Sequence, residues 1–185
     1  MGPHGSFSLD EAKRRSWYSP EAILKDLQPG MTFVDVGCGE GFFSILAAKK
    51  VGVDGRVYAV DVDPVGVEKL KNIADEEKLT NIIIRNSRAE ETVFCEGCAD
   101  FVFYSMDLHD FDDPTKVLAN ARKMIKPSGL LVDLDWKKQD TPFGPPERIR
   151  FSEKKVAELL EATGFFVEST KEAGPYHYII TAKPR

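Results

Sequence analysis

The sequence predicts an α/β fold, in which strands and helices alternate along the chain. Short apolar runs recur, and each is followed by a loop and then by a stretch with apolar residues at helical spacing. One such run leads directly into a glycine-rich loop. We expect strands at residues 33–36, 56–61, 82–85, 101–105 and 130–136, and a closing hairpin at 165–170 and 178–182. We expect helices at residues 20–27, 42–50, 64–78, 114–127 and 152–163.

Composition favours a single domain. The chain has 185 residues, a size at which one domain buries a sizeable core, and we assign this domain to residues 19–185. No apolar run approaches the roughly 20 residues that span a bilayer, so we expect a cytoplasmic protein without a membrane anchor. The net charge of −5 argues against a broad nucleic-acid surface. The oligomeric state cannot be predicted.

The first 18 residues have no regular period. They contain the basic run Lys13-Arg-Arg15 and the aromatic pair Trp17-Tyr18. Two interpretations remain open for residues 1–18: a flexible leader, or a cap that closes over the active site.

The glycine-rich loop carries glycine at positions 37, 39 and 41, between a buried strand and a helix. Glycine allows a sharp turn and lets bare backbone approach a ligand, and the helix N-terminus adds partial positive charge. A dinucleotide loop would read Gly-x-Gly-x-x-Gly, which this spacing does not match. Asp35, inside the strand, suits a cationic ligand group. Asp61 ends the next strand, where two ribose hydroxyls could donate to its carboxylate.

The segment Val34-Asp-Val-Gly-Cys-Gly-Glu-Gly41, followed by Val60-Asp61-Val-Asp63, resembles the first two motifs of class I S-adenosylmethionine-dependent methyltransferases. The segments 100–109, 112–114 and 124–129 are similar to the small ubiquinone/menaquinone-methyltransferase-like branch of that family. The resemblance implies a Rossmann-like three-layer sandwich with strand order 3-2-1-4-5-7-6, in which only strand 7 is antiparallel. It also implies S-adenosylmethionine as the cofactor.

The resemblance places the adenine of the cofactor beside the loop after the third strand. Ser87 could accept from the exocyclic amine and the Ala89 N–H could reach a ring nitrogen, although serine-rich turns are also common for local reasons. The expected cofactor-binding residues are Asp35, Gly37, Cys38, Gly39, Gly41, Asp61, Val62, Ser87, Arg88, Ala89 and Ser105.

The implied chemistry is in-line attack of an acceptor atom on the sulfonium methyl, for which the protein must mainly hold two reactants together and exclude water. A base is needed only when the acceptor must lose a proton. His109, Asp107 and His177 are the candidate catalytic residues, with Asp135 a further candidate base. The family often has an apolar residue at 107 and a histidine at 110, where this chain has aspartates.

Three segments are expected to enclose the acceptor: residues 17–18, the loop 136–150 and residues 176–178. Their aromatic walls suit a small, partly apolar molecule, and Arg148 or Arg150 could pair with an acid group on it. The alternative is that the loop merely covers the core. The candidate acceptor residues are Trp17, Tyr18, Tyr104, Asp135, Trp136, Phe143, Arg148 and Tyr176.

Cys95 and Cys98 form a single C-x-x-C pair in a loop before a strand. A structural zinc needs four ligands and a redox motif would open a helix, so we expect no metal and a possible local disulfide.

Three classes of function stay open. A small-molecule methyltransferase is favoured. A methyltransferase acting on RNA or protein would require the basic residues of the leader and of the loop 137–150 to converge on one rim. The third class is a cofactor-binding protein without catalysis, or a nicotinamide-dependent oxidoreductase, which the glycine spacing disfavours.

Overall fold

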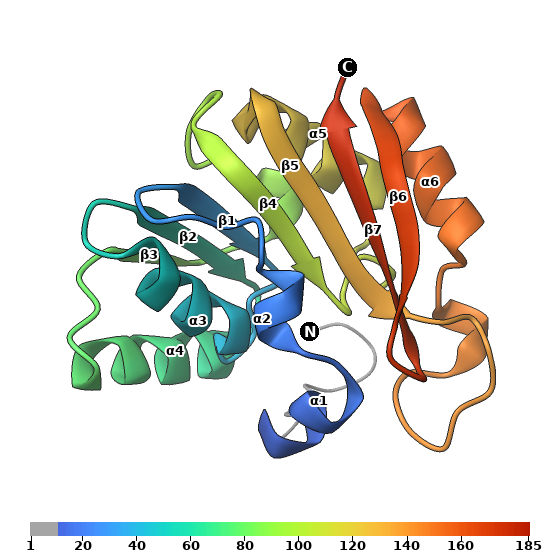
Figure 1. Cartoon of the computed structure of the whole chain (residues 1–185), viewed down its shortest axis with the longest axis horizontal. Helices are drawn as coiled ribbons and strands as arrows, with labels where there is room; N and C mark the ends of the chain where they lie inside the picture. The colour runs from blue at the N-terminus through green and yellow to red at the C-terminus, as the bar shows by residue number, and fades with distance from the viewer. Residues whose placement is uncertain (1–10) are drawn as a thin grey trace.

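The computed structural model describes residues 11–185, which form a seven-stranded sheet with helices on both faces (Figure 1). The strands are β1 (Thr32–Val36), β2 (Arg56–Asp61), β3 (Ile82–Asn86), β4 (Ala99–Ser105), β5 (Ile125–Trp136), β6 (Phe165–Ala173) and β7 (His177–Pro184). The helices are α1 (Glu11–Trp17), α2 (Pro20–Ile23), α3 (Phe42–Val51), α4 (Pro64–Glu76), α5 (Pro114–Met124) and α6 (Glu153–Ala162), with short 3₁₀ turns η1 (Ala89–Glu91) and η2 (Glu147–Ile149).

The strand order is β3-β2-β1-β4-β5-β7-β6, as predicted. All neighbours are parallel except the pairs that β7 makes with β5 and β6. Strand order reverses between β1 and β4, and ligands of open α/β sheets bind beyond the carboxyl ends of the strands at that point. The glycine loop follows β1 there, and residues 106–113 follow β4.

Two apolar layers cover the sheet. One face, with Phe33, Phe103 and Trp136, packs against residues of α2 and α3. The opposite face, with Val34, Val102 and Tyr104, packs against α5 and α6. Because side chains alternate along a strand, successive residues along β5, and likewise along β7, belong to different layers.

Several boundaries differ from the prediction. The helix α2 ends at Ile23, not at Leu27 as expected. Leu24 and Leu27 are buried, but they enter the core from the turn that follows the helix. The helix α5 ends at Met124, and β5 begins at Ile125, five residues earlier than expected, with a register shift against β4 where Pro127 lacks an N–H. The hairpin is also longer, so that His177 lies in β7.

The N-terminal segment contains the helix α1, which the sequence did not indicate. Its last residue, Trp17, is buried, and Tyr18 follows it into the core. The first ten residues of the predicted leader lie outside the described residues. Among residues 11–185, the helices are all too short or too polar to cross a membrane.

Candidate active site

The three glycines of the loop after β1 all have a positive φ, and they meet different neighbours. A Cβ at Gly37 would collide with the carboxyl group of Asp107, and one at Gly41 would collide with the side chain of Leu70 in α4. A Cβ at Gly39, where φ is +51°, would meet nothing within 4 Å. Gly37 and Gly41 therefore serve close packing, whereas Gly39 presents bare backbone to open space above the sheet.

Asp61 is held at the end of β2 by backbone N–H groups. Gly39 donates to Oδ2 at 2.7 Å, and Asp63 donates to Oδ1 at 2.8 Å. The carboxylate thus links the end of β2 to the glycine loop. Each oxygen keeps acceptor capacity for a further donor.

Asp35 is buried at the carboxyl end of β1 and accepts a hydrogen bond of 2.5 Å from the hydroxyl of Ser44 in α3. Burial raises the pKa of Asp35 to about 7, and the Ser44 hydroxyl only partly offsets this. The carboxyl group is therefore only partly ionised near neutral pH, and an approaching cation would favour its charged form.

The loop after β3 contains the residues predicted to hold adenine. The Ser87 N–H donates to the carbonyl of Asp61 at 3.0 Å, so this loop is fixed to the end of β2. The Ala89 carbonyl accepts from Asn120 of α5 at 3.2 Å. Arg88 forms an ion pair of 2.6 Å with Asp112, while Val62 is exposed.

A histidine that follows β4 and an aspartate in β5 form a buried pair. Nδ1 of His109 lies 2.9 Å from Oδ2 of Asp135, whose Oδ1 accepts the N–H of Trp136 at 2.7 Å. The side chains of His109 and Asp135 are 1% and 0% exposed. Burial opposes protonation of His109, but Asp135 outweighs burial, and the pKa of His109 is raised above its ordinary value.

The other nitrogen of His109, Nε2, has no hydrogen-bond partner within residues 11–185, and Asp110 lies 3.7 Å from it. The carboxylate of Asp135 favours the tautomer with the proton on Nδ1, which leaves Nε2 as an acceptor. The pair can therefore take a proton at Nε2 and stabilise the resulting imidazolium.

Asp107 lies two residues before His109, and its carboxyl group lies against Gly37 of the glycine loop. Both its carboxyl oxygens are buried without a partner in the described part of the chain. Burial, followed by the charge of Asp135 and then of Asp35, raises the pKa of Asp107 well above its usual range. A neutral carboxyl group results, which is a poor base.

Asp133 and Tyr104 lie side by side on β5 and β4, beneath α5 and α6. Both are fully buried, and neither side chain has a hydrogen-bond partner among residues 11–185. Burial raises the pKa of Asp133 and of Tyr104 well above the ordinary range. The Ser105 hydroxyl is also buried without a partner in this part of the chain.

Five aromatic residues meet at the carboxyl end of β5, which we call the aromatic cluster: Trp17, Trp136, Phe143, Tyr176 and His177. Trp17 stacks on Phe143 with ring centroids 4.8 Å apart, and His177 lies 4.2 Å from Trp136. The three segments that the sequence analysis grouped together therefore come into contact. Tyr178 was included wrongly, because it faces the opposite layer, next to Asp135.

His177 lies in the centre of the aromatic cluster, 0% exposed, with neither ring nitrogen hydrogen-bonded to a described residue. Burial lowers the pKa of His177 to about 3, and Arg14, Arg150 and Lys137 add to the effect. The imidazole is therefore neutral at physiological pH.

Arg150 is bound within its own loop, and its expected pairing with an acid group of the acceptor stays a prediction. Its guanidinium is buried and donates to the carbonyls of Pro145, Lys137, Gln139 and Phe143 and to the hydroxyl of Thr141. All five N–H groups of the side chain can be satisfied in this way. Arg150 thus holds the loop 137–150 around itself, and Arg148 is exposed beside it.

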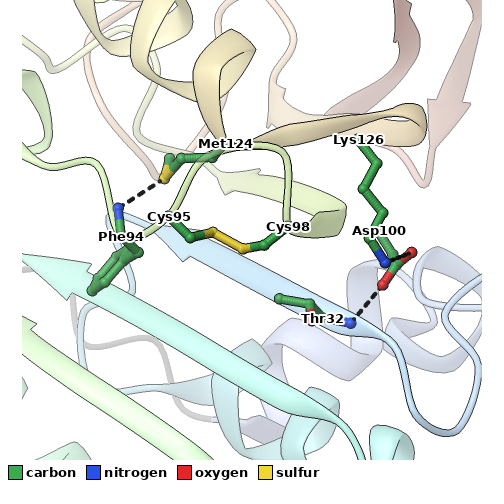
Figure 2. The surroundings of a disulfide bond; sticks show 7 residues. All are labelled: Thr32, Phe94, Cys95, Cys98, Asp100, Met124 and Lys126. Carbon is green, nitrogen blue, oxygen red and sulfur yellow. Dashed lines mark hydrogen bonds and ion pairs between the residues drawn. A yellow bond between two sulfur atoms is a disulfide. The ribbon is translucent and has the colours of Figure 1, made fainter.

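Cys95 and Cys98 form a disulfide in the loop before β4 (Figure 2). The same loop is tied to the end of α5, because Phe94 N–H donates to the sulfur of Met124 at 3.3 Å. The described His, Cys, Asp and Glu residues form no group of three or more that could hold a metal ion. The disulfide lies before β4, at the opposite end of that strand from His109.

Sequence reasoning missed several residues that shape the site. Ser44 gave no signal beyond lying in a helix, and Asp133 stood out only as a carboxylate in a central strand. The role of Arg150 depends on a loop conformation that no local pattern encodes.

Comparison with known proteins agrees with this geometry. A family model described as a methyltransferase domain matches residues 27–176. The crystal structure of a SAM-dependent methyltransferase from Aquifex aeolicus superposes with a TM-score of 0.89 at 32% identity, covering 95% of this chain and 94% of the other. The chain belongs to the class I S-adenosylmethionine-dependent methyltransferase family.

Within that family, curated relatives include demethylmenaquinone methyltransferases. The protein of Listeria welshimeri is 29% identical over 130 residues, which are 68% of this chain and 53% of the relative. That of Desulfitobacterium hafniense is 28% identical over 138 residues, 74% of this chain and 53% of the relative. The chain spans about half the length of the curated relatives it matches.

Proposed function

We propose that this protein transfers the methyl group of S-adenosylmethionine to a small-molecule acceptor. The observation that carries the proposal is the open backbone at Gly39, next to a carboxylate, Asp61, that is fixed by two N–H groups. Family membership supplies the nature of the ligand. The bound cofactor supplies an activated methyl group, and the protein's own residues bind, orient and exclude water.

The residues around Gly39 fit such a cofactor. Asp61 would accept from the ribose hydroxyls, and the loop after β3, with Ser87, Arg88 and Ala89, would lie along the adenine. Asp35 and Asp107 are buried carboxyl groups whose pKa values are raised, and a ligand with ammonium and sulfonium groups would favour their charged forms. The remaining predicted contacts, Gly37, Cys38, Gly41, Val62 and Ser105, stay part of this proposal.

For an acceptor that must lose a proton, His109 is the base that the geometry favours. Asp135 orients it through Nδ1, and Nε2 is left without a partner in the described chain. Asp107 is too strongly shifted toward its neutral form, and His177, with a pKa of about 3, binds protons weakly. We therefore assign Asp107 to cofactor binding and His177 to the acceptor wall.

The aromatic cluster would enclose the acceptor, with Tyr18, Tyr104 and Arg148 as the less central candidates from the sequence. Residues 11–18 contribute Trp17 to the cluster, which favours the cap over the leader. A cytoplasmic location stays a prediction, which cell fractionation tests.

A target of RNA or protein is less well supported. Lys137 pairs with Glu172 at 3.0 Å, and Arg15 pairs with Glu11 and Glu21. Arg150 is bound by loop carbonyls. Arg15, Lys137 and Arg150 are therefore occupied within the chain, which weakens the case for a broad surface that binds RNA.

The test is cofactor binding and turnover with a matched pair of variants. The wild type should bind S-adenosylmethionine and not NAD, and should release S-adenosylhomocysteine with members of a panel of phenols, quinols, thiols and amines. Gly39→Val should abolish cofactor binding while the protein stays folded, because a branched side chain would fill the open space.

Gly30→Val is the control, since Gly30 also has a positive φ, +80°, and open surroundings but lies before β1, at the opposite end of that strand from Gly39. The two variants carry similar backbone strain, of roughly 1–2 kcal/mol. Normal cofactor binding by Gly39→Val would mean that the loop has been misread.

A further inference from the structure

A cationic cavity of about 260 Å³ lies between the loop 137–150 and the start of α6. Four of its seven lining residues are basic and none is acidic, although the whole chain carries a net charge of −5. The basic residues are Lys138, Arg148, Arg150 and Lys155. This concentration of positive charge is independent of the cofactor loop.

Two of the four basic side chains, Lys138 and Arg150, are fixed in place by hydrogen bonds. Lys138 donates to the carbonyls of Glu147 and Arg150, at 3.2 and 2.7 Å, and Arg150 donates to the loop around it. The partners of both cations are neutral oxygens and not carboxylates. Their positive charge is therefore held rigidly without being neutralised.

The other two basic side chains offer free donors. Arg148 and Lys155 are exposed, and neither side chain forms an ion pair or a hydrogen bond with any described residue. Glu147 and Glu153 are neighbours in sequence but do not line the cavity. Ser152 caps α6 there, so the positive end of that helix adds to the potential.

The cavity adjoins the catalytic pair. Arg150, in its wall, is close enough for its charge to oppose protonation of both His109 and His177. Tyr178, which is paired with Asp135 across β5 and β7, donates to the carbonyl of Phe151 in the cavity wall at 3.4 Å. Arg150 and Phe151, which line the cavity, are thus neighbours of the groups around His109 and Asp135.

We propose that the cationic cavity binds an anionic group, a carboxylate or a phosphate, of the methyl acceptor. The statement that the bound anion belongs to the methyl acceptor rests on the proposed function. The binding of an anion in the cavity does not depend on it. The acceptor would place its charged group among Lys138, Arg148 and Lys155 and its reacting atom toward His109. The preferred acceptors are therefore organic acids or phosphate esters and not neutral quinols.

The first measurement is calorimetric titration of inorganic pyrophosphate into protein saturated with S-adenosylhomocysteine. We expect one site per chain, and at least a tenfold weaker dissociation constant in the double variant Arg148→Glu/Lys155→Glu. The matched control, Lys116→Glu/Lys154→Glu, makes the same change in net charge on exposed positions that do not line the cavity, and should change affinity less than twofold. An equal loss in both double variants, or no binding at about 10 mM, overturns the site.

A second titration decides whether the anion belongs to the acceptor. With S-adenosylhomocysteine bound, 4-hydroxybenzoate should bind at least tenfold more tightly than 4-hydroxybenzamide, and pyrophosphate should displace it. If pyrophosphate binds but the acid shows no advantage over the amide, the cavity takes a free anion and the assignment to the acceptor is wrong. Binding of S-adenosylhomocysteine, measured beforehand, reports separately on the proposed function.

Discussion

At the scale of single residues, the glycine loop shows three glycines with two different requirements. Gly37 and Gly41 are needed because Asp107 and Leu70 occupy the space of their missing side chains. Gly39 is needed for the ligand, because the space above it is open. The sequence predicted a ligand loop, but it could not separate these requirements, since they depend on residues that lie 29 and more positions away along the chain.

Asp61→Ala should weaken binding of S-adenosylhomocysteine at least tenfold and leave the protein folded. The variant loses charge-assisted hydrogen bonds to the ribose, worth about 1.5–3 kcal/mol, and also releases the Gly39 N–H that the carboxylate now holds. Calorimetry measures the affinity. Asp63→Ala is the control, because Asp63 only caps α4 and its loss should lower stability without a comparable loss of affinity. Unchanged affinity in Asp61→Ala would refute the assignment.

His177 should make the protein less stable in acid. Its pKa falls from an ordinary value near 6.5 to about 3 because of burial, with Arg14, Arg150 and Lys137 adding to it. Between these values the unfolded chain binds a proton that the native protein does not, so the free energy of unfolding falls as pH falls from about 6.5 to 3. The slope for one such group is at most about 1.4 kcal/mol per pH unit.

Urea unfolding at several pH values measures this contribution. His177→Leu lacks the titrating group, so its free energy of unfolding should depend less steeply on pH than that of the wild type over the same window. Parallel curves for the two proteins would show that His177 is already protonated in the native state or is accessible to water.

At the scale of elements, helices and strands were predicted closely where residues at their own ends mark them. The positions of β1, β2 and α6 were predicted closely, because an apolar run, a capping serine or a proline marks their ends. The early start of β5 and the short α2 were missed, since both depend on packing between distant segments. The helix α1 has no apolar period because a single residue, Trp17, anchors it.

The same reasoning applies to the candidate site. Asp61 and the glycine loop could be found from spacing, because they end consecutive strands of one sheet edge. The pairing of His109 with Asp135 could not, since two candidate bases 26 positions apart became one pair only through the folding of β4 beside β5. The aromatic cluster was predicted from composition, and Tyr178 was misplaced because side chains alternate along β7, so that Tyr178 and His177 face different layers.

The Cys95–Cys98 disulfide closes a very short loop at the end of the sheet opposite the site. For a loop of this length the entropy of closure contributes about 2 kcal/mol. Dithiothreitol should therefore lower the melting temperature of the wild type by about 4–8 °C. It should not affect Cys95→Ser/Cys98→Ser, in which no bridge forms.

Cofactor affinity gives a second readout of the disulfide. Because this loop is fixed to α5 by Phe94 and Gly97 and not to the glycine loop, reduction should leave affinity for S-adenosylhomocysteine within about twofold. An equal shift in melting temperature in both proteins would show that dithiothreitol acts elsewhere.

At the scale of the whole molecule, the two halves of the sheet carry different parts of the candidate site. The strands β1, β2 and β3 carry the glycine loop, Asp61 and the residues expected at the adenine. The strands β5 and β7 carry Asp135, the aromatic cluster and the loop that Arg150 organises. The strand β4 lies between the two halves (Figure 1), and the segment after it carries Asp107 and His109. Reversal of strand order at this point opens a crevice in sheets of this kind.

The most direct test of this account is a crystal structure of the protein with S-adenosylhomocysteine. We expect the ribose hydroxyls within hydrogen-bond distance of Asp61, the ligand backbone over Gly39, and the sulfur facing the side of the crevice on which His109 lies. Absence of the ligand from crystals grown with a saturating concentration, or a ligand bound elsewhere with Gly39 still uncovered, would contradict the account.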